Sequence, residues 1–556
     1  MQHWSLRLGI SLGLSLGLTA CSKPDPSSAE HWLGKLESGE RLSAIQKLGE
    51  LKATGAVERL KQEYKKGTDR HAIVAALGKI GDKSVVPLLL EALQGMDESL
   101  AQIAGETLKL WEVKEPVDTY IAVAANPGAP KRARLVALEL LVRFPDPKAA
   151  PTLVSILESD PDKDPILFMG LAAEALGKLG TEQAVSGLIR CQWLDDHGRA
   201  NEVPRCRMAL NRIGPKAVPG IIEALERKNR GVEERARKFM FDKGGLIEAK
   251  CGELLGDMPD PSAVEPLIAS LKQFDELPPN MTDPRKVQMF VMSGVQKVIS
   301  LSNALAVTGD ERAVKPLLEL AGDKELALEH KLAGVQQLAF LGQQSAVPGM
   351  QKLLAVDADP EDPVSNGFRV QIALNLANLI DGSQPKVVDG AEKQITAIQA
   401  KVQKWVADWE KKAESLQGQD KQAAAANVAG YKEWHKNYGE ALGKLKALRE
   451  CKGDTACWGT KLTDADEGIR MKAAYQLANE KTDKAGALKA LETQMGTNDL
   501  TLRNVVFFGL GRLGDKSLLP ALEKVRAADE AIAQKDARFS GAKYTTELMI
   551  AKLGHK

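Results

Sequence analysis

The sequence predicts an all-α protein, a curved α-solenoid of stacked helical hairpins that carries one longer hairpin. The phrase LGKIGDKSVVP at Leu77–Pro87 returns as LGRLGDKSLLP at Leu510–Pro520, with weaker copies between the two. Neighbouring copies are 33 or 34 residues apart, as between Gly180 and Gly214. The residues before each glycine have helical spacing of apolar side chains. A phrase that recurs over nearly the whole chain indicates a stack of similar units and not one closed core.

Each copy of the phrase predicts a helix, a short turn and a second helix. Ile73, Leu77 and Ile80 lie three and four positions apart, which places them on one face of a helix. Gly81 is expected to end this helix in the left-handed conformation, where a Cβ atom is unfavourable. Asp82 is expected to accept hydrogen bonds from the first amides of the following helix. A proline near that helix start is tolerated because the first amides of a helix have no partner there.

The repeated unit resembles HEAT repeats, in particular the short HEAT-like repeats also found in bilin lyases. The resemblance rests on an arginine that enters the first helix (Arg70, Arg470 and Arg503), a Leu-Gly end, and an Ala/Val-x-Pro-Leu start to the second helix. Tetratricopeptide and ankyrin repeats have a similar period, but their sequence signatures are missing. The resemblance implies roughly ten to twelve two-helix units over residues 40–530. It also implies a binding surface, without naming the ligand.

The chain is expected to divide into five segments. They are an apolar N-terminal segment (1–20), a cysteine with a flexible tether (21–39), an N-terminal solenoid (40–382), a helical-hairpin insertion (383–450), and C-terminal repeats with a capping helix (451–556). Among the 556 residues, 75 are Lys or Arg and 74 are Asp or Glu. This balance gives no global basic field, so no nucleic-acid partner is expected.

The N-terminus resembles the signal peptide of a bacterial lipoprotein. Arg7 precedes a short apolar run that ends Leu18-Thr19-Ala20-Cys21, similar to the lipobox of that family. The resemblance implies cleavage before Cys21 and acylation of that cysteine, and several acyl chains anchor a protein firmly. Ser22 is not the aspartate that often retains lipoproteins at the inner membrane. We expect an envelope protein, at the outer membrane in preference to the inner one, with its solenoid in the periplasm or at the cell surface. The alternative is an ordinary secretory signal with a chance cysteine.

Export predicts that the remaining cysteines form disulfides. Cys451 and Cys457 bracket a Gly-Asp turn, and Cys191 and Cys206 bracket a polar connection between two helical stretches. Both pairs are expected to be bonded, whereas Cys251 lies in an Ala/Leu-rich helix and is expected to be a buried free thiol. The sequence contains no Cys-x-x-Cys motif and no paired histidines, so neither a metal nor a cofactor is expected.

The segment 383–450 departs from the repeat. Its apolar residues follow three- and four-residue steps on both sides of Gly418–Gln422, which predicts a long antiparallel helical hairpin that reverses there. The hairpin contains Trp405, Trp409 and Trp434. Two interpretations stay open. These rings either seal the hairpin's own seam, or they form a docking arm for another envelope protein.

One nucleotide-binding motif is excluded by its context. Gly509–Gly514 satisfies G-x-G-x-x-G, but a dinucleotide site needs a strand before the glycines and a helix that opens on them. Here the glycines end one helix and precede another, as they do at Leu77–Pro87.

The leading hypothesis for function is therefore a non-enzymatic, protein-binding scaffold, whose partners are envelope proteins and whose membrane contact is the N-terminal lipid. Polar residues of second helices are candidate contacts on a concave face, namely Glu91, Glu223 and Glu319. One alternative is a HEAT-like lyase or a protein that handles a chromophore or another small ligand, although fold does not give function. A third possibility is binding to a cell-wall polysaccharide.

Overall fold

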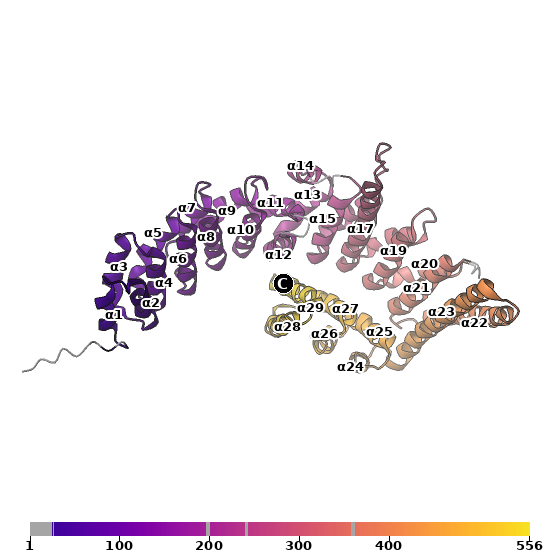
Figure 1. Cartoon of the computed structure of the whole chain (residues 1–556). Helices are drawn as coiled ribbons and strands as arrows, with labels where there is room; N and C mark the ends of the chain where they lie inside the picture. Colours follow the sequence, from indigo (N-terminus) through magenta and orange to yellow (C-terminus); the bar gives the residue numbers. More distant parts are fainter. Residues whose placement is uncertain (1–24, 26, 196–200, 239–242, 357–361, 556) are drawn as a thin grey trace, which may run out of the picture. The chain divides into compact units, whose positions relative to one another are not determined.

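Helices account for most of the residues that the computed structural model describes, which are 25, 27–195, 201–238, 243–356 and 362–555. Within these ranges the only β-type pairing is a single bridge between Asp195 and Asn201. The predicted all-α fold is confirmed. The chain forms two compact units, Met1–Phe144 and Pro145–Lys556 (Figure 1).

The first unit is a stack of helical pairs in which α2, α4, α6 and α8 pack side by side as first helices. Its helices are α1 (Ala29–Lys35), α2 (Arg41–Glu50), α3 (Val57–Lys65), α4 (Arg70–Ile80), α5 (Val86–Gln94), α6 (Glu98–Leu110), α7 (Val117–Ala125) and α8 (Lys131–Arg143). The flexible tether predicted for residues 21–39 is wrong for residues 29–35. Ser28 caps α1 by accepting a hydrogen bond from the amide of His31, Leu36 is fully buried, and α1 packs against α2.

The second unit has its own row of first helices, from α10 to α29. Its helices up to the hairpin are α9 (Ala150–Leu157), α10 (Ile166–Leu179), α11 (Val185–Arg190), α12 (Val203–Ile213), α13 (Val218–Leu225), α14 (Arg230–Lys238), α15 (Leu246–Asp257), α16 (Val264–Leu271), α17 (Pro284–Thr308), α18 (Val314–Gly322), α19 (Leu328–Leu341), α20 (Val347–Leu354) and α21 (Pro363–Leu379). The remaining helices are α22 (Pro385–Glu414), α23 (Gly418–Cys451), α24 (Thr455–Lys461), α25 (Glu467–Ala478), α26 (Lys484–Glu492), α27 (Leu500–Leu513), α28 (Leu519–Ala533) and α29 (Arg538–Gly554).

This row closes on itself within the second unit. Each of the first helices α10, α12, α15, α17, α19, α21, α23, α25, α27 and α29 contacts the next one, and α29 also packs against α12 (Figure 1). We call the side of α12, α15, α17, α19 and α21 that contacts α25, α27 and α29 the inner face. The sequence does not predict that the chain's own C-terminal helices cover this face.

The repeated phrase forms the turn that the sequence predicts, with one addition. Gly81 has φ +87° and ends α4, and the Asp82 carboxylate accepts a hydrogen bond of 2.8 Å from the amide of Ser84. That amide belongs to a 3-10 turn at Lys83–Val85, which precedes the second helix. The second copy of the phrase differs because Gly514 has φ −82°. A Cβ atom there would lie 2.6 Å from Leu518 Cδ1, so glycine is required by close packing and not by its backbone angle.

Two features of the sequence hold neighbouring helices together. The Leu-Gly end lets first helices approach closely, since a Cβ atom on Gly177 would lie only 2.6 Å from the Cα atom of Ala209. The arginine that enters a first helix reaches the end of the preceding second helix. Arg70 Nε donates to the carbonyl of Tyr64 at 3.2 Å, and Arg134 Nε donates to that of Ala124 at 3.1 Å. Both carbonyls belong to the last turn of a helix, where a cation is favourable.

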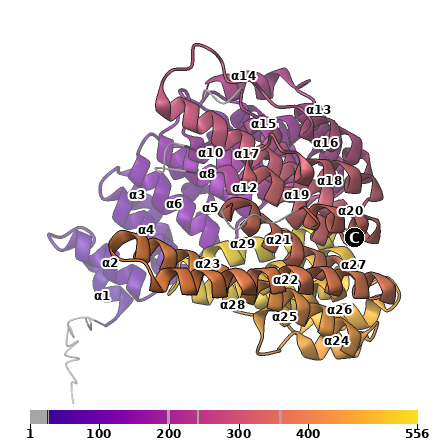
Figure 2. The same ribbon diagram turned by 90° about the vertical axis from the view of Figure 1, so that its right-hand side faces the viewer.

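The long hairpin consists of α22 and α23, which run side by side (Figure 2). The reversal lies at Ser415–Gln417, so its predicted position at Gly418–Gln422 is wrong, and those residues instead begin α23. The hairpin is also not an insertion into the stack. α23 packs between α21 and α25, in the place of a first helix. The stack therefore continues through two lengthened helices.

Candidate binding sites

Cys21, the predicted lipid attachment site, lies outside the described residues.

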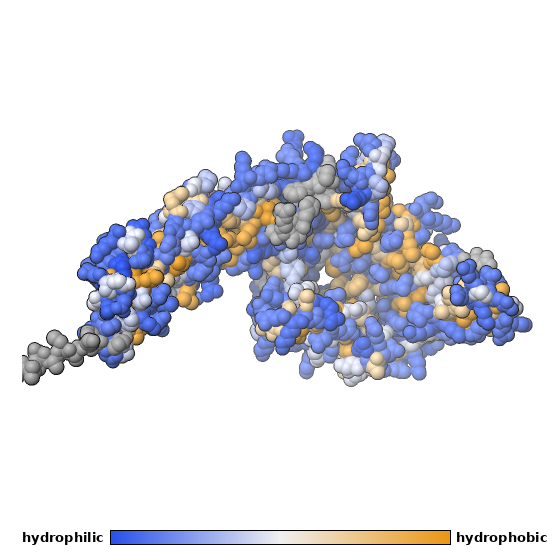
Figure 3. Space-filling view, viewed as in Figure 1, coloured by the Kyte–Doolittle hydropathy of each residue, from blue (hydrophilic) through white to orange (hydrophobic). Residues whose placement is uncertain are grey.

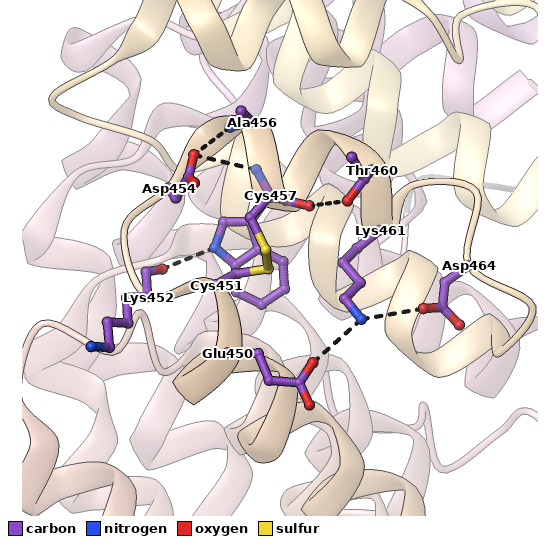
Figure 4. Close-up of a disulfide and its surroundings, with 10 residues drawn as sticks. Glu450, Cys451, Lys452, Asp454, Ala456, Cys457, Thr460, Lys461 and Asp464 are labelled. Atoms are coloured by element: carbon purple, nitrogen blue, oxygen red, sulfur yellow. Dashed lines mark hydrogen bonds and ion pairs between the residues drawn. A yellow bond between two sulfur atoms is a disulfide. The ribbon is translucent and has the colours of Figure 1, made fainter.

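Both predicted cysteine pairs are joined as disulfides in the structure. The Cα atoms are 5.9 Å apart in Cys191–Cys206 and 5.4 Å apart in Cys451–Cys457. The second bond links the end of α23 to α24 (Figure 4), where Asp454 caps α24 by accepting a hydrogen bond of 2.9 Å from the amide of Ala456. The disulfides therefore fasten connections between helices.

Cys251 is a buried free thiol, as predicted. Burial raises its pKa well above the usual range, which keeps the sulfur protonated and unreactive.

The structure brings the three predicted tryptophans together around one buried tyrosine. The Tyr431 ring is 5.9 Å from that of Trp405, 6.1 Å from that of Trp409 and 5.4 Å from that of Trp434. Tyr431 is 3% exposed, whereas all three indoles remain partly exposed. The rings therefore seal the seam of the hairpin and also present aromatic surface from both helices. We call these four residues the hairpin cluster.

The hairpin is fixed to the stack at its base. Gln394 Nε2 donates to the carbonyl of Gln351 in α20 at 2.9 Å. Further along α22, Gln399 Nε2 donates a hydrogen bond of 3.0 Å to the carbonyl of His435 in α23. The hairpin cluster lies beyond this point, towards the reversal.

The predicted contacts on second helices are not gathered into a site. Glu91 belongs to the first unit, and Glu223 and Glu319 lie on α13 and α18 of the second unit. All three are exposed, and Glu319 lies 3.5 Å from Lys272 in an exposed ion pair. Most of the surface in Figure 3 is hydrophilic, with apolar surface in the grooves between successive helices. These glutamates are therefore part of a solvated face.

α17 is long and apolar enough to cross a membrane by length and composition, but half of its apolar window is buried inside the protein. It packs against α15, α16 and α19, which identifies it as a core helix of the stack. The N-terminal half of α17 exposes three large apolar side chains, Met289, Val291 and Met292.

Polar and aromatic contacts hold the C-terminal helices on the inner face. Tyr544 Oη donates to the carbonyl of Pro204 at 3.1 Å, and a nitrogen of His555 lies 3.0 Å from the carbonyl oxygen of Asn211. The Phe340 ring of α19 packs edge-on against Phe508 of α27, with ring centroids 5.2 Å apart. These contacts join α12 and α19 to helices that follow them by many repeats.

Arg512 is the central cation of this contact. Its guanidinium donates to the carbonyl of Ala306, near the end of α17, at 3.1 Å and also donates a hydrogen bond to Asn479 Oδ1. The same group lies 4.4 Å from the centroid of the Phe508 ring. Burial lowers its pKa to about 10.

Lys472 joins α25 to the end of α21. It is fully buried, and its ammonium donates to the carbonyls of Asn378 at 3.1 Å and Ile380 at 2.5 Å. Burial lowers its pKa well below the usual value, and the nearby Lys444 adds to this shift.

A cleft lies between the inner face and α27 and α29. Two adjoining cavities of about 280 and 370 Å³ form it. Five residues line both cavities: Asn211, Asp257, Val307, Phe508 and Lys552. Each cavity has further lining residues of its own. Asp257 accepts hydrogen bonds of 2.6 and 2.8 Å from Arg207 and one of 3.1 Å from Asn211 Nδ2. Burial alone would lower the pKa of Arg207, but the Asp257 carboxylate raises it above its usual value.

Sequence reasoning missed this cleft, although one signal points to it. In the repeated phrase, Asn211 stands in Leu-Asn-Arg-Ile-Gly where Gly78 and Gly177 stand in other copies. A polar side chain at a position that is glycine or alanine in the other copies marks a place where neighbouring first helices leave room. Within the described ranges, no group of three or more His, Cys, Asp or Glu side chains is arranged to hold a metal ion.

Comparison with protein families identifies the repeats. Residues 118–202 match the model of HEAT repeats, and residues 69–95 match the PBS lyase HEAT-like repeat. No curated protein matches the chain in sequence.

Among solved structures, the chain is similar to karyopherins at low identity. The karyopherin Kap121p bound to the extreme C-terminus of the protein phosphatase Cdc14p matches with 12% identity and a TM-score of 0.29, over 96% of this chain and 61% of the karyopherin. Yeast importin-β (Kap95p) matches with 12% identity and a TM-score of 0.34, over 94% of this chain and 88% of importin-β. The chain thus spans less than two thirds of the length of Kap121p. The chain therefore contains HEAT-like repeats, at residues 69–95 and 118–202.

Proposed function

We propose that this protein is a non-enzymatic scaffold of the bacterial cell envelope, anchored by lipid at Cys21, which binds another envelope protein. The observation that carries the binding proposal is the hairpin cluster. Three tryptophans from two lengthened helices gather at one place and remain partly exposed.

The chemistry of the hairpin cluster fits a protein partner. Tryptophan and tyrosine are enriched at the energetic centres of protein interfaces because they bury a large area and lose little side-chain freedom. Packing against Tyr431 already orders the indoles, which lowers the entropy cost of binding. Charged groups surround the rings, including Lys412 at 4.2 Å from the Trp409 ring centroid and the ion pair of Lys432 with Glu410. An apolar centre with a charged rim is the usual composition of such an interface.

Site-specific photo-crosslinking in intact cells tests the partner. A photoreactive amino acid at Trp409 is expected to give discrete protein adducts of reproducible mass. The same amino acid at Glu319, which is exposed on α18, serves as the control and is expected to give no such adduct. Equal adduct patterns at the two positions, or none at Trp409, would contradict binding through the hairpin.

Acyl labelling tests the anchor independently. The sequence Leu18-Thr19-Ala20-Cys21 supports lipidation, so the chain is expected to incorporate labelled fatty acid and to sediment with membranes. A Cys21→Ser variant is expected to lose the label and to be released in soluble form. Retention of the label in this variant would show that Cys21 is not the attachment site.

A further inference from the structure

The cleft beneath α27 and α29 has the composition of a ligand site. Its two cavities share five lining residues and so lie side by side. Its walls combine apolar side chains, such as Val307, Phe508 and Met258, with a few polar groups. Mostly apolar walls with a small number of oriented polar groups are typical of small-molecule sites. We propose that this cleft binds a small anionic molecule that also carries a hydroxyl group.

Positive charge at the cleft favours an anion. Lys552 lines both cavities, and Arg512 lines the smaller one. These two side chains come from α29 and α27, and they face the inner face across the cleft. The low pKa of Arg512 has burial as its cause, so a bound anion would stabilise the charged guanidinium. Arginine and lysine are the usual partners of carboxylates and phosphates.

The carboxylates of the cleft are already engaged by the protein. Asp257 is held by two hydrogen bonds from Arg207. Asp260 accepts hydrogen bonds from the amide of Ser262 at 2.8 Å and from its hydroxyl at 2.6 Å, as the cap of a 3-10 turn. Asp257 and Asp260 are therefore directed to structural partners. Arg512 also has partners in the protein, but together with Lys552 it places positive charge on the opposite wall, which favours an anion there.

Asn211 supplies the second contact. It is 1% exposed, and it lines both cavities. Its Nδ2 donates to the carbonyl of Arg207 and to Asp257, which fixes the orientation of the amide. Among the described residues, no group donates to its buried Oδ1. Buried acceptors in folded proteins nearly always have a donor, so a hydroxyl hydrogen of the ligand fits this position.

Three matched probes test the contact with the cations and the contact with Asn211 separately. L-malate carries two carboxylates and a hydroxyl, succinate has the same carboxylates without the hydroxyl, and choline carries a hydroxyl on a cation. In isothermal titration calorimetry with the full-length protein, malate is expected to bind saturably and about tenfold more tightly than succinate, because succinate leaves Asn211 Oδ1 without a donor. Choline is expected not to bind.

Two variants on one helix locate the site. Lys552→Met removes a cation of the cleft at similar length and is expected to weaken malate binding about tenfold. Lys543→Met is the control, since Lys543 pairs with Glu530 away from the cleft and its loss is expected to leave the affinity unchanged. Circular dichroism confirms that both variants are folded. The proposal is overturned if malate shows no saturable binding in the millimolar range, if succinate or choline binds as well as malate, or if Lys552→Met retains the original affinity.

Discussion

Individual buried charges in this protein are tied to specific joints between helices. Arg503 of α27 and Asp529 of α28 are each 3% exposed and form hydrogen bonds of 2.9 and 2.5 Å, and the hydroxyl of Thr546 in α29 donates to the same carboxylate at 3.0 Å. The pair thus connects the last three helices. Such a pair adds little net stability as a whole, but loss of one partner leaves an uncompensated buried charge.

Replacement of Asp529 by alanine is therefore expected to destabilise the C-terminal repeats by about 3–5 kcal/mol. Hydrogen exchange of α27, α28 and α29 measures this loss directly. The control Thr546→Val removes the hydrogen bonds of one hydroxyl with Arg503 and Asp529 but keeps the ion pair, and it is expected to cost about 1–2 kcal/mol. Equal effects of the two variants would show that the ion pair is not desolvated.

Lys472 makes stability depend on pH. Because burial lowers its pKa in the folded state below that in the unfolded chain, the folded state binds fewer protons between the two pKa values. The free energy of unfolding is therefore expected to rise with pH through this window, up to the unfolded pKa of about 10.4. In Lys472→Met the rise between neutral pH and mildly alkaline pH is expected to be smaller. Denaturant unfolding at two pH values measures this rise, and an identical pH dependence in the variant would contradict a lowered pKa of the buried Lys472.

At the scale of the helix pair, each disulfide crosslinks the connection between two helices. Cys191–Cys206 closes a connection with a sequence separation of 15 residues, which corresponds to about 3 kcal/mol of stabilisation in the chain-entropy description. The double variant Cys191→Ser, Cys206→Ser is expected to lower the stability of the second unit by up to this amount. A Cys251→Ala variant is the matched control for a lost buried sulfur without a lost bond. Thermal unfolding under non-reducing conditions compares them, and equal melting temperatures would show that the bond does not form.

Much of each helix pair was predictable from the sequence because its causes are local. Gly81 and Asp82 determine a helix end and a cap through their own backbone and side chain, and the structure has both. The position of the hairpin reversal was not predictable from Gly418–Gln422, since a Gly/Asp-rich stretch can also begin a helix. The place of α23 in the row of first helices depends on packing against α21 and α25, which no local pattern encodes.

The closed row of the second unit arises only at the scale of many repeats. The position of Lys79 in the repeated phrase is held by Val307 in α17 and by Phe340 in α19. In the structure Phe340 contacts Phe508, and Val307 lines the cleft. Apolar residues at a position that is charged in other repeats thus mark a covered face. Their partners follow about 170 to 200 residues later in the chain, which is why the sequence alone does not pair them.

The contact between α12 and α29 is expected to slow amide hydrogen exchange in both helices. The double variant Tyr544→Phe, His555→Ala removes the two polar contacts to α12 and leaves the hydrogen bonds of Arg503 with Asp529 in place. Amide hydrogen exchange in α12 is expected to become faster, because α29 then separates from it more often. Exchange in α28 serves as the internal reference and is expected to stay unchanged. Unchanged exchange in α12 would mean that this contact does not protect it.

The most direct test of the scaffold proposal removes the hairpin cluster while the stack stays intact. A short Gly/Ser linker that joins Lys401 to Lys436 deletes all three tryptophans and keeps the base of the hairpin, where Gln394 contacts α20. Affinity purification of the lipid-anchored protein from cells compares this variant with the full chain. We predict that the variant keeps the melting temperature of the stack and loses the partner protein. Recovery of the same partner in the same yield would contradict the proposal that the hairpin is the binding arm.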